Sequence, residues 1–209
     1  VCIAIVMTQR NILPYKIKAL VVWLQRMKHI QGFGIQSPSA FSFDRKVIND
    51  HTSYPIYAEL KRLGDTLTSV ERKKARLLNR INRFAEADRF CFYPTKLSAY
   101  ESYIKAACEK TLVEEAKTLG EEGEGTVSDE SAIYFLTVSE HCQAFYERLR
   151  TSINAQSFVI VDDIKRNAET RAFWQQIVDD ERVSFSFDLY HIGIAFFDKR
   201  PKQNYIINF

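Results

Sequence analysis

Two adjacent carboxylates stand where a buried strand is expected to end. The run FVIV (158–161) contains no polar residue, which predicts a strand buried on both faces, and Asp162 and Asp163 follow it. In open α/β sheets, ligands bind in the crevice outside the carboxyl ends of the strands. The pair is therefore a candidate site, with Asp162 as a candidate catalytic residue. The alternative is that both aspartates cap a helix expected near residue 167.

A histidine follows another expected strand. His141 lies in the first turn of a helix predicted over 140–153, just after a strand predicted over 132–138. Because imidazole titrates near neutrality, His141 could serve as a general base; the alternative is a solvated histidine on a helix surface. His191 lies in an expected hairpin and is assigned a structural role. The spacings yield no Ser-His-Asp or Cys-His constellation, and no Walker or H-E-x-x-H motif occurs.

Strand and helix patterns alternate from Arg89 onward, and they would position these candidates. Strands are expected over 89–94, 132–138 and 157–164, helices over 98–119, 140–153 and 167–179, and a terminal hairpin over 183–197 and 204–209. This alternation predicts an α/β fold with a mostly parallel sheet, helices on both faces and an antiparallel C-terminal hairpin. The expected α/β domain covers residues 87–209.

An N-terminal helical extension is expected over residues 1–86. Its helices are predicted over 12–30, 54–64 and 69–85. The last begins with a capping box, in which Glu71 follows Thr68 by three residues, and Gly64 would end the helix before it. The helix over 12–30 is basic and amphipathic, so it could lie on an anionic membrane; packing against its own domain is the alternative.

The net charge of +3 hides an asymmetry between the two halves of the chain. Residues 1–110 carry a charge of +10 and residues 111–209 carry −7. Lysine and arginine are dense between residues 61 and 83, which makes nucleic acid a candidate partner of these basic helices. The alternative is that the two halves complement each other, within one chain or between subunits.

Cysteine usage and the lack of long apolar runs indicate a cytoplasmic protein. The dispersed Cys2, Cys91, Cys108 and Cys142 form no C-x-x-C pair, which is typical of reduced thiols in a reducing compartment. The opening residues 1–6 (VCIAIV) are too short for the apolar part of a signal peptide, and Met7 follows them. No run approaches the ~20 apolar residues that a membrane span needs.

Two stretches of the chain resemble a known family. GFGIQSPSAF (32–41) is similar to the G-x-G-x-x-S-P-x-x-F box near the amino end of a group of small bacterial class I SAM-dependent methyltransferases. The residues that match this box are Gly32, Gly34, Ser37, Pro38 and Phe41. FVIVDDI (158–164) and the segment 185–209 resemble that family's carboxyl-terminal third. The resemblance implies a Rossmann-like methyltransferase fold, with the terminal hairpin as its reversed last strands.

The same resemblance implies a magnesium site. In the metal-dependent branch of the family, an Asp ending the fourth strand and an Asp with a neighbouring oxygen ligand ending the fifth strand hold Mg²⁺, which requires oxygen ligands. Asp162 and Asp163 match the second element. The first element falls at residues 136–138, where no carboxylate stands. For an active enzyme, the resemblance therefore implies SAM as cofactor and Mg²⁺ with an incomplete ligand set.

The turn after the first strand departs from the family. That family binds SAM on a glycine-rich loop of the form E-x-G-x-x-x-G, because only bare backbone can approach the methionine part of the cofactor closely. Here the turn is Tyr93-Pro94-Thr95-Lys96-Leu97-Ser98, and no glycine occurs between Gly64 and Gly120. The residues placed to contact the cofactor would be Tyr93, Thr95 and Ser98. Their bulk, and the charge of Lys96 beside a sulfonium, argue against SAM binding.

The interval before the next strand is short. Only 43 residues separate Arg89 from Ala132, and no run rich in β-formers is found between 98 and 131. The sheet is therefore predicted to lack the family's second and third strands, and with them the carboxylate that holds the cofactor ribose. Strand 89–94 would then be an edge, which predicts a homodimer joined through it or a helix covering it.

Three classes of function follow from these patterns. The first choice is a degenerate, non-catalytic relative of SAM-dependent methyltransferases, kept as a binding or scaffolding module. The second is an active SAM-dependent methyltransferase acting on a small molecule. The third is nucleic-acid binding through the basic helices of residues 61–83.

Overall fold

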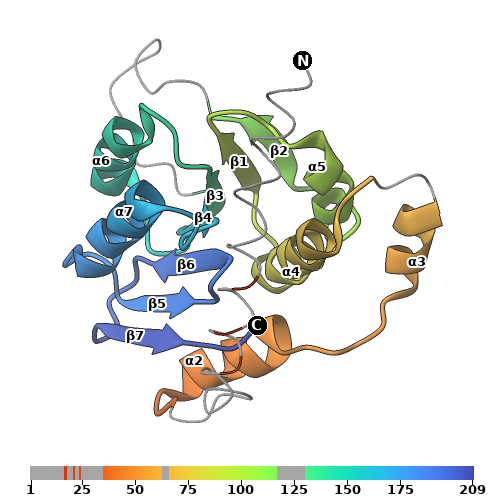
Figure 1. Ribbon diagram of the computed structural model, residues 1–209, viewed down its shortest axis with the longest axis horizontal. Coiled ribbons are helices and arrows are strands. Elements are labelled where there is room, and N and C mark those ends of the chain that lie inside the picture. The colour runs from red at the N-terminus through yellow and green to blue at the C-terminus, as the bar shows by residue number, and fades with distance from the viewer. Residues whose placement is uncertain (1–16, 18–20, 22–23, 25–34, 63–65, 117–129) are drawn as a thin grey trace.

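The chain forms one sheet with helices on both faces (Figure 1). The computed structural model describes residues 17, 21, 24, 35–62, 66–116 and 130–209. Of the helix predicted over 12–30, only Ile17, Val21 and Leu24 are described; they are helical and exposed. Gly32, Gly34 and Gly64 lie outside the described residues.

Strands of both directions make up the sheet. The strands are β1 (Arg89–Tyr93), β2 (Leu112–Glu115), β3 (Ala132–Leu136), β4 (Phe158–Asp162), β5 (Phe185–Asp188), β6 (Ile192–Phe196) and β7 (Gln203–Ile206). In the described residues their order across the sheet is β2-β1-β3-β4-β6-β5-β7. The first four run parallel, β6 runs antiparallel to β4 and β5, and β7 lies parallel beside β5. The predicted α/β fold, mostly parallel with an antiparallel C-terminal part, is confirmed.

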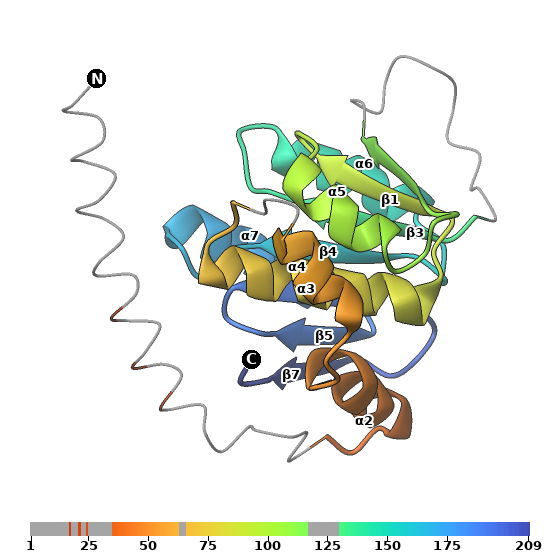
Figure 2. The same ribbon diagram turned by 90° about the vertical axis from the view of Figure 1, so that its right-hand side faces the viewer.

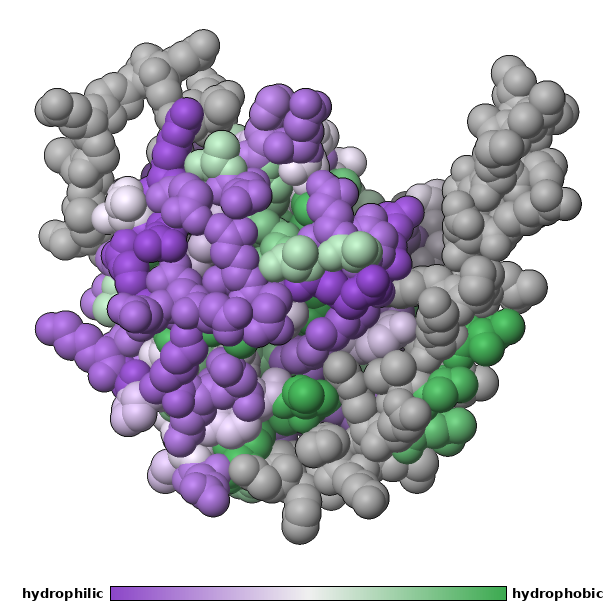
Figure 3. Space-filling view, turned by 60° about the vertical axis from the view of Figure 1, so that its left-hand side comes forward, coloured by the Kyte–Doolittle hydropathy of each residue, from purple (hydrophilic) through white to green (hydrophobic). Residues whose placement is uncertain are grey.

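Helices cover the two faces in unequal numbers (Figure 2). One face carries α2 (Pro38–Phe43), the π-helical segment η2 (Asp44–Ile48), α3 (Pro55–Arg62), α4 (Ser69–Ala85) and α5 (Ser98–Lys105). The other face carries α6 (Cys142–Ser152) and α7 (Ala168–Asp179), whose outer surface is largely hydrophilic (Figure 3). Among the described residues, none of the helices is both long and apolar enough to span a membrane.

The segment after α5 corrects the predicted topology. The helix expected over 98–119 ends at Lys105, and β2 pairs in parallel with β1, so the predicted loss of the second strand is wrong. The sequence Leu-Val-Glu-Glu has little strand propensity; pairing with β1 and burial of Val113 decide its conformation. No further strand precedes β3 in the described residues, and 117–129 lie outside them.

The presence of β2 also moves the edge of the sheet. β1 has β2 on one side and β3 on the other, so the prediction of an open edge at residues 89–94 is wrong. The edges of the described sheet are β2 and β7. A homodimer joined through β1 therefore has no free backbone edge to use. The C-terminal part differs as well: β5 and β6 form the antiparallel hairpin, and β7 crosses to the far side of β5.

Local signals at the helix starts were reliable for α4 and not for α5. Thr68 accepts a hydrogen bond from the Glu71 backbone N–H, and the Glu71 carboxylate accepts one from the Thr68 N–H, so the predicted capping box is present. In α5 the cap is Leu97 without a side-chain hydrogen bond, and Glu101 pairs with Lys96 instead. Ser98 has Glu101 three residues after it, the spacing of a capping box, but it does not cap the helix.

Alternation along β4 decides which way its last side chain points. Phe158 and Ile160 belong to the core beneath α4, whereas Val159 and Val161 belong to the core beneath α6 and α7. Because successive side chains of a strand point to opposite faces, Asp162 points to the α4 side. The helix that precedes the sheet in sequence is thereby placed over the carboxyl end of β4.

The described part of the extension predicted over 1–86 packs into the same hydrophobic core as the sheet. Phe43 of α2 lies 5.4 Å from Phe187 and 5.1 Å from Phe196, measured between ring centroids. Leu77, Leu78 and Ile81 of α4 belong to the same buried cluster as these strand residues. The boundary predicted at residue 86 thus does not separate two hydrophobic cores among the described residues.

Candidate functional site

A buried lysine stands between the two candidate carboxylates. The Lys74 Nζ lies 2.6 Å from Asp162 Oδ1 and 2.6 Å from Asp163 Oδ1. The exposed fractions of the three side chains are 4%, 14% and 24%, in the same order. Both contacts are charge-assisted hydrogen bonds, which are short and strong. The site is therefore a compact cluster of one ammonium and two carboxylates.

Backbone geometry brings both carboxylates to the same ammonium. Asp162 is the last residue of β4, and Asp163 takes a left-handed conformation (φ 49°), which bends the chain sharply at the strand end. The bend is held by the Asp163 N–H, which donates to the His191 carbonyl at 2.7 Å, and by the Arg166 N–H, which donates to the Asp163 carbonyl at 2.9 Å. Lys74 reaches the pair from the buried side of α4.

Burial and charge act against each other in this cluster. Burial lowers the pKa of Lys74, but the carboxylates of Asp162 and Asp163 outweigh it and hold that pKa above its ordinary value. Burial raises the pKa of Asp162, opposed by the Lys74 ammonium. Lys74 is therefore charged at neutral pH, and its ammonium is the cation that the carboxylates bind.

The residues at this site do not fit a magnesium ion. One oxygen of each carboxylate already accepts a hydrogen bond from the Lys74 ammonium, and Nζ lies between them. The described residues contain no group of three His, Cys, Asp or Glu side chains that could hold a metal. Mg²⁺ is usually held by one or two carboxylates and several waters, and here the Lys74 ammonium occupies the position between the two carboxylates that the ion would need. Asp162 and Asp163 are adjacent, as predicted, but with a lysine as their counter-ion.

The capping alternative for the aspartates is wrong. The N-cap of α7 is Asn167, whose Oδ1 accepts from the Thr170 N–H at 2.8 Å. The Thr170 hydroxyl in turn accepts from the Asn167 N–H at 3.1 Å. The helix thus begins four residues beyond Asp163 with a complete capping box, and both aspartates are left for Lys74.

Lys96 ties the turn after β1 to β2 and to α5. The Lys96 N–H donates to Glu115 Oε2 at 3.0 Å, and the Lys96 Nζ lies 3.0 Å from Glu101 Oε2. Tyr93 points away from the turn, toward α6, where its ring stacks on Phe145 at 4.0 Å between centroids. The predicted cofactor residues are thus not gathered into one surface: Tyr93 is buried on the α6 side, and Thr95 and Ser98 are exposed.

Glu115 is a candidate site residue that the sequence reasoning missed. It ends β2, which is where a dinucleotide-binding fold carries the carboxylate for the cofactor ribose. The residue went unnoticed because its strand is only four residues long and reads as helix. Lys74 was missed as well, although its position in the sequence indicated that it would be buried. It lies on the apolar stripe of α4 with Val70, Leu77 and Ile81, at a position where a core residue is expected.

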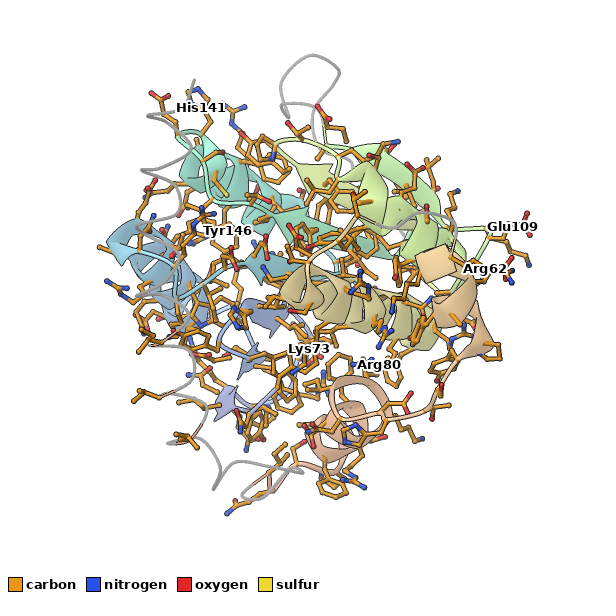
Figure 4. All side chains as sticks on the ribbon, turned by 45° about the vertical axis from the view of Figure 1, so that its right-hand side comes forward. Arg62, Lys73, Arg80, Glu109, His141 and Tyr146 are labelled. Atoms are coloured by element: carbon orange, nitrogen blue, oxygen red, sulfur yellow. The ribbon has the colours of Figure 1, made fainter. Side chains whose placement is uncertain are left out.

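His141 and the N-terminal box stand apart from the carboxylates. His141 is exposed at the start of α6, and no contact links it to Asp162 in the described structure; Figure 4 shows it at the tip of that helix. Ser37 caps α2, with its hydroxyl accepting from the Ala40 N–H, and Pro38 occupies the first helical position. Phe41 of the box is 44% exposed. The described part of the box therefore starts a helix.

Comparisons with known proteins find likenesses in structure. No protein-family profile matches the chain, and no curated protein sequence matches it. A methyltransferase from Geobacter sulfurreducens superimposes with a TM-score of 0.45 at 9% identity, over 78% of this chain and 98% of that one. A Klebsiella pneumoniae protein provisionally named an O-methyltransferase superimposes with a TM-score of 0.39 at 11% identity, over 74% of this chain and 95% of that one.

Proposed function

We propose that this chain is a non-catalytic relative of the SAM-dependent methyltransferases, acting as a binding module. The observation that carries the proposal is the Lys74 ammonium bound by Asp162 and Asp163 at the carboxyl end of β4. In an open α/β sheet this end is where ligands bind. Here it is filled by a side chain of the protein, whose two short hydrogen bonds join α4 to the sheet. The carboxylates then stabilise the fold and are not available to a metal.

The turn between β1 and α5 supports the same conclusion for the cofactor. SAM needs close approach of bare backbone, and this turn carries a side chain beyond glycine at every position from Tyr93 to Ser98. One of its backbone donors, the Lys96 N–H, is taken by Glu115. The cluster also places the charged Lys74 in the crevice, where a sulfonium would meet a like charge. The residues present do not fit the cofactor.

A second candidate function is SAM-dependent methyl transfer, which Glu115 favours. Its carboxylate is exposed at the end of β2, the position from which a ribose is held in dinucleotide-binding folds. One oxygen of that carboxylate, Oε2, already accepts from the Lys96 N–H, and the turn that it holds carries no glycine. The glycine-free turn places methyl transfer below the non-catalytic proposal.

Titration calorimetry with SAM, and separately with its demethylated product, distinguishes the two candidates. We expect no saturable heat from either compound, because the turn and the Lys74 cluster leave no site for them. Saturable heat would contradict the proposal. In that case Glu115→Gln, compared with its neighbour Glu114→Gln, identifies the ribose carboxylate. Glu114 is the matched control because it pairs with Arg89 on β1 and not with the turn.

A further inference from the structure

A large basic pocket lies on the side of α4 away from the carboxylate cluster. Its volume is about 970 Å³, and it is enclosed by α3, α4, the segment 48–55 and residues 208–209. The described residues that line it include five cations and one carboxylate. The cations are Lys61, Arg72, Lys73, Arg76 and Arg80, and the carboxylate is Asp50. Figure 4 shows Lys73 and Arg80 projecting from the same side of α4.

The single carboxylate of Asp50 offsets only part of the positive charge of these cations. Its Oδ1 accepts from the Thr52 N–H at 2.8 Å, and its Oδ2 accepts from the Tyr54 hydroxyl at 2.8 Å. Among the described residues, Lys73, Arg76 and Arg80 have no carboxylate within ion-pair distance. The pocket therefore carries an excess of positive charge.

Arg80, which lines the pocket, is held by backbone carbonyls and is attracted by the Asp50 carboxylate without forming an ion pair with it. It is only 9% exposed, and its guanidinium donates to the carbonyls of Val47 at 2.6 Å and Ile48 at 3.2 Å. Arg76 has a buried Nε with no hydrogen-bond acceptor among the described residues. Buried donors are normally satisfied, so the Arg76 Nε is a donor in this pocket that is available to an anionic ligand.

Aromatic rings lie between the cations. The Arg76 guanidinium is 5.2 Å from the centre of the Tyr57 ring, and Lys73 Nζ is 4.3 Å from that of Phe209. Arg83, one helical turn beyond Arg80, lies 4.8 Å from the centre of the Tyr54 ring. Lys73, Arg76, Arg80 and Arg83 share one face of α4, and at 1.5 Å per residue this row is about 15 Å long.

We infer that single-stranded nucleic acid binds along this row, with one nucleotide seated in the basic pocket. Arginine forks match phosphate geometry, and positive grooves with interleaved aromatic rings are typical of single-strand binding. The row of cations on α4 is longer than the phosphate group of a single nucleotide. It continues past the pocket to Arg83, which does not line the pocket. Partial desolvation of the Lys73 ammonium at the pocket wall lowers its pKa, and the nearby Arg80 lowers it further, so a bound phosphate would relieve the crowding of like charges. The inference concerns a site separate from the crevice and stands apart from the question of methyl transfer.

The test is fluorescence anisotropy with labelled RNA and DNA single strands of about twelve nucleotides. We expect binding whose log affinity falls with log salt concentration at a slope near −3, as for about four phosphate contacts. The variant Lys73→Gln/Arg76→Gln should bind about tenfold more weakly or worse and show a shallower slope. Arg80 is left unchanged because it supports the backbone of residues 47–48.

A matched control removes the same charge elsewhere. Arg171 and Arg182 are exposed on the α7 side of the sheet, so Arg171→Gln/Arg182→Gln should bind like the wild type. ATP and a DNA duplex are the competing ligands. Binding of ATP without binding of the strands would overturn the inference and make the pocket a small-molecule site. Equal weakening by both double variants, a salt-independent affinity, or no binding at all would overturn it as well.

Discussion

Replacing Lys74 with methionine is expected to lower the free energy of unfolding by about 3–5 kcal/mol. Methionine keeps most of the volume of the side chain but removes the ammonium that Asp162 and Asp163 share at 2.6 Å. Two partly buried carboxylates would then face each other without a counter-ion, which is what makes the loss large. Urea denaturation followed by circular dichroism measures the change.

Two further variants separate this charge effect from simple loss of packing. Lys73→Met changes the adjacent residue of α4, which is exposed, and should cost less than about 0.5 kcal/mol. The triple variant Lys74→Met/Asp162→Asn/Asp163→Asn removes the charges together and should recover a large part of the loss, because buried ion triads can often be replaced at little cost. A loss that the aspartate substitutions do not reduce would contradict the charge explanation.

Replacing Phe43 with alanine is expected to cost about 3–5 kcal/mol and to destabilise the whole sheet. The Phe43 ring packs edge-on to Phe84 of α4 and Phe196 of β6, both within 5.4 Å between centroids. Its removal would leave a cavity between the extension and the strands. The unfolding midpoint is best followed by Trp174, a buried residue of α7 on the opposite face of the sheet.

The measurement is made in a Trp23→Phe background, since the chain has two tryptophans. The matched control is Phe41→Ala in the same helix, where the ring is 44% exposed and should contribute far less. If residues 1–86 formed a separate unit, Phe43→Ala would leave the Trp174 transition unchanged. That outcome would contradict a shared core.

Features set by local pattern were predictable from the sequence. The alternation of strands and helices, the capping box at Thr68 and the length of α4 all follow from nearby residues, and the structure has them where they were expected. The run before Asp162 was apolar enough to identify a buried strand, and the burial of β4 between β3 and β6 confirms that interpretation.

Features set by distant residues were not predictable. The composition of β2 alone favours a helix. The segment becomes a strand because it pairs with β1, and Glu114 of β2 also binds Arg89 of β1. The partner of Asp162 is 88 positions away in sequence, on a helix that carries many other cations. Only the spacing of Lys74 within the apolar stripe distinguished it from them.

The basic pocket shows the same limit. A surplus of lysine and arginine over residues 61–83 was visible in the sequence and suggested nucleic acid. That these cations enclose a pocket with Asn208, Phe209 and the segment 48–55 depends on how the C-terminal strand returns beside α4. The sequence could indicate the charge of the site, but not its concave shape.

The most direct test of the account is whether the Lys74 ammonium has taken the place of a metal ion. Lys74→Ala leaves Asp162 and Asp163 without a counter-ion and opens space between them. Thermal unfolding of this variant and of the wild type is compared with and without millimolar Mg²⁺, with Lys73→Ala as control. We predict that Mg²⁺ raises the melting temperature of Lys74→Ala and leaves those of the wild type and the control unchanged. Equal stabilisation of the wild type by Mg²⁺ would show that the carboxylates accept a metal beside Lys74, and would contradict the account.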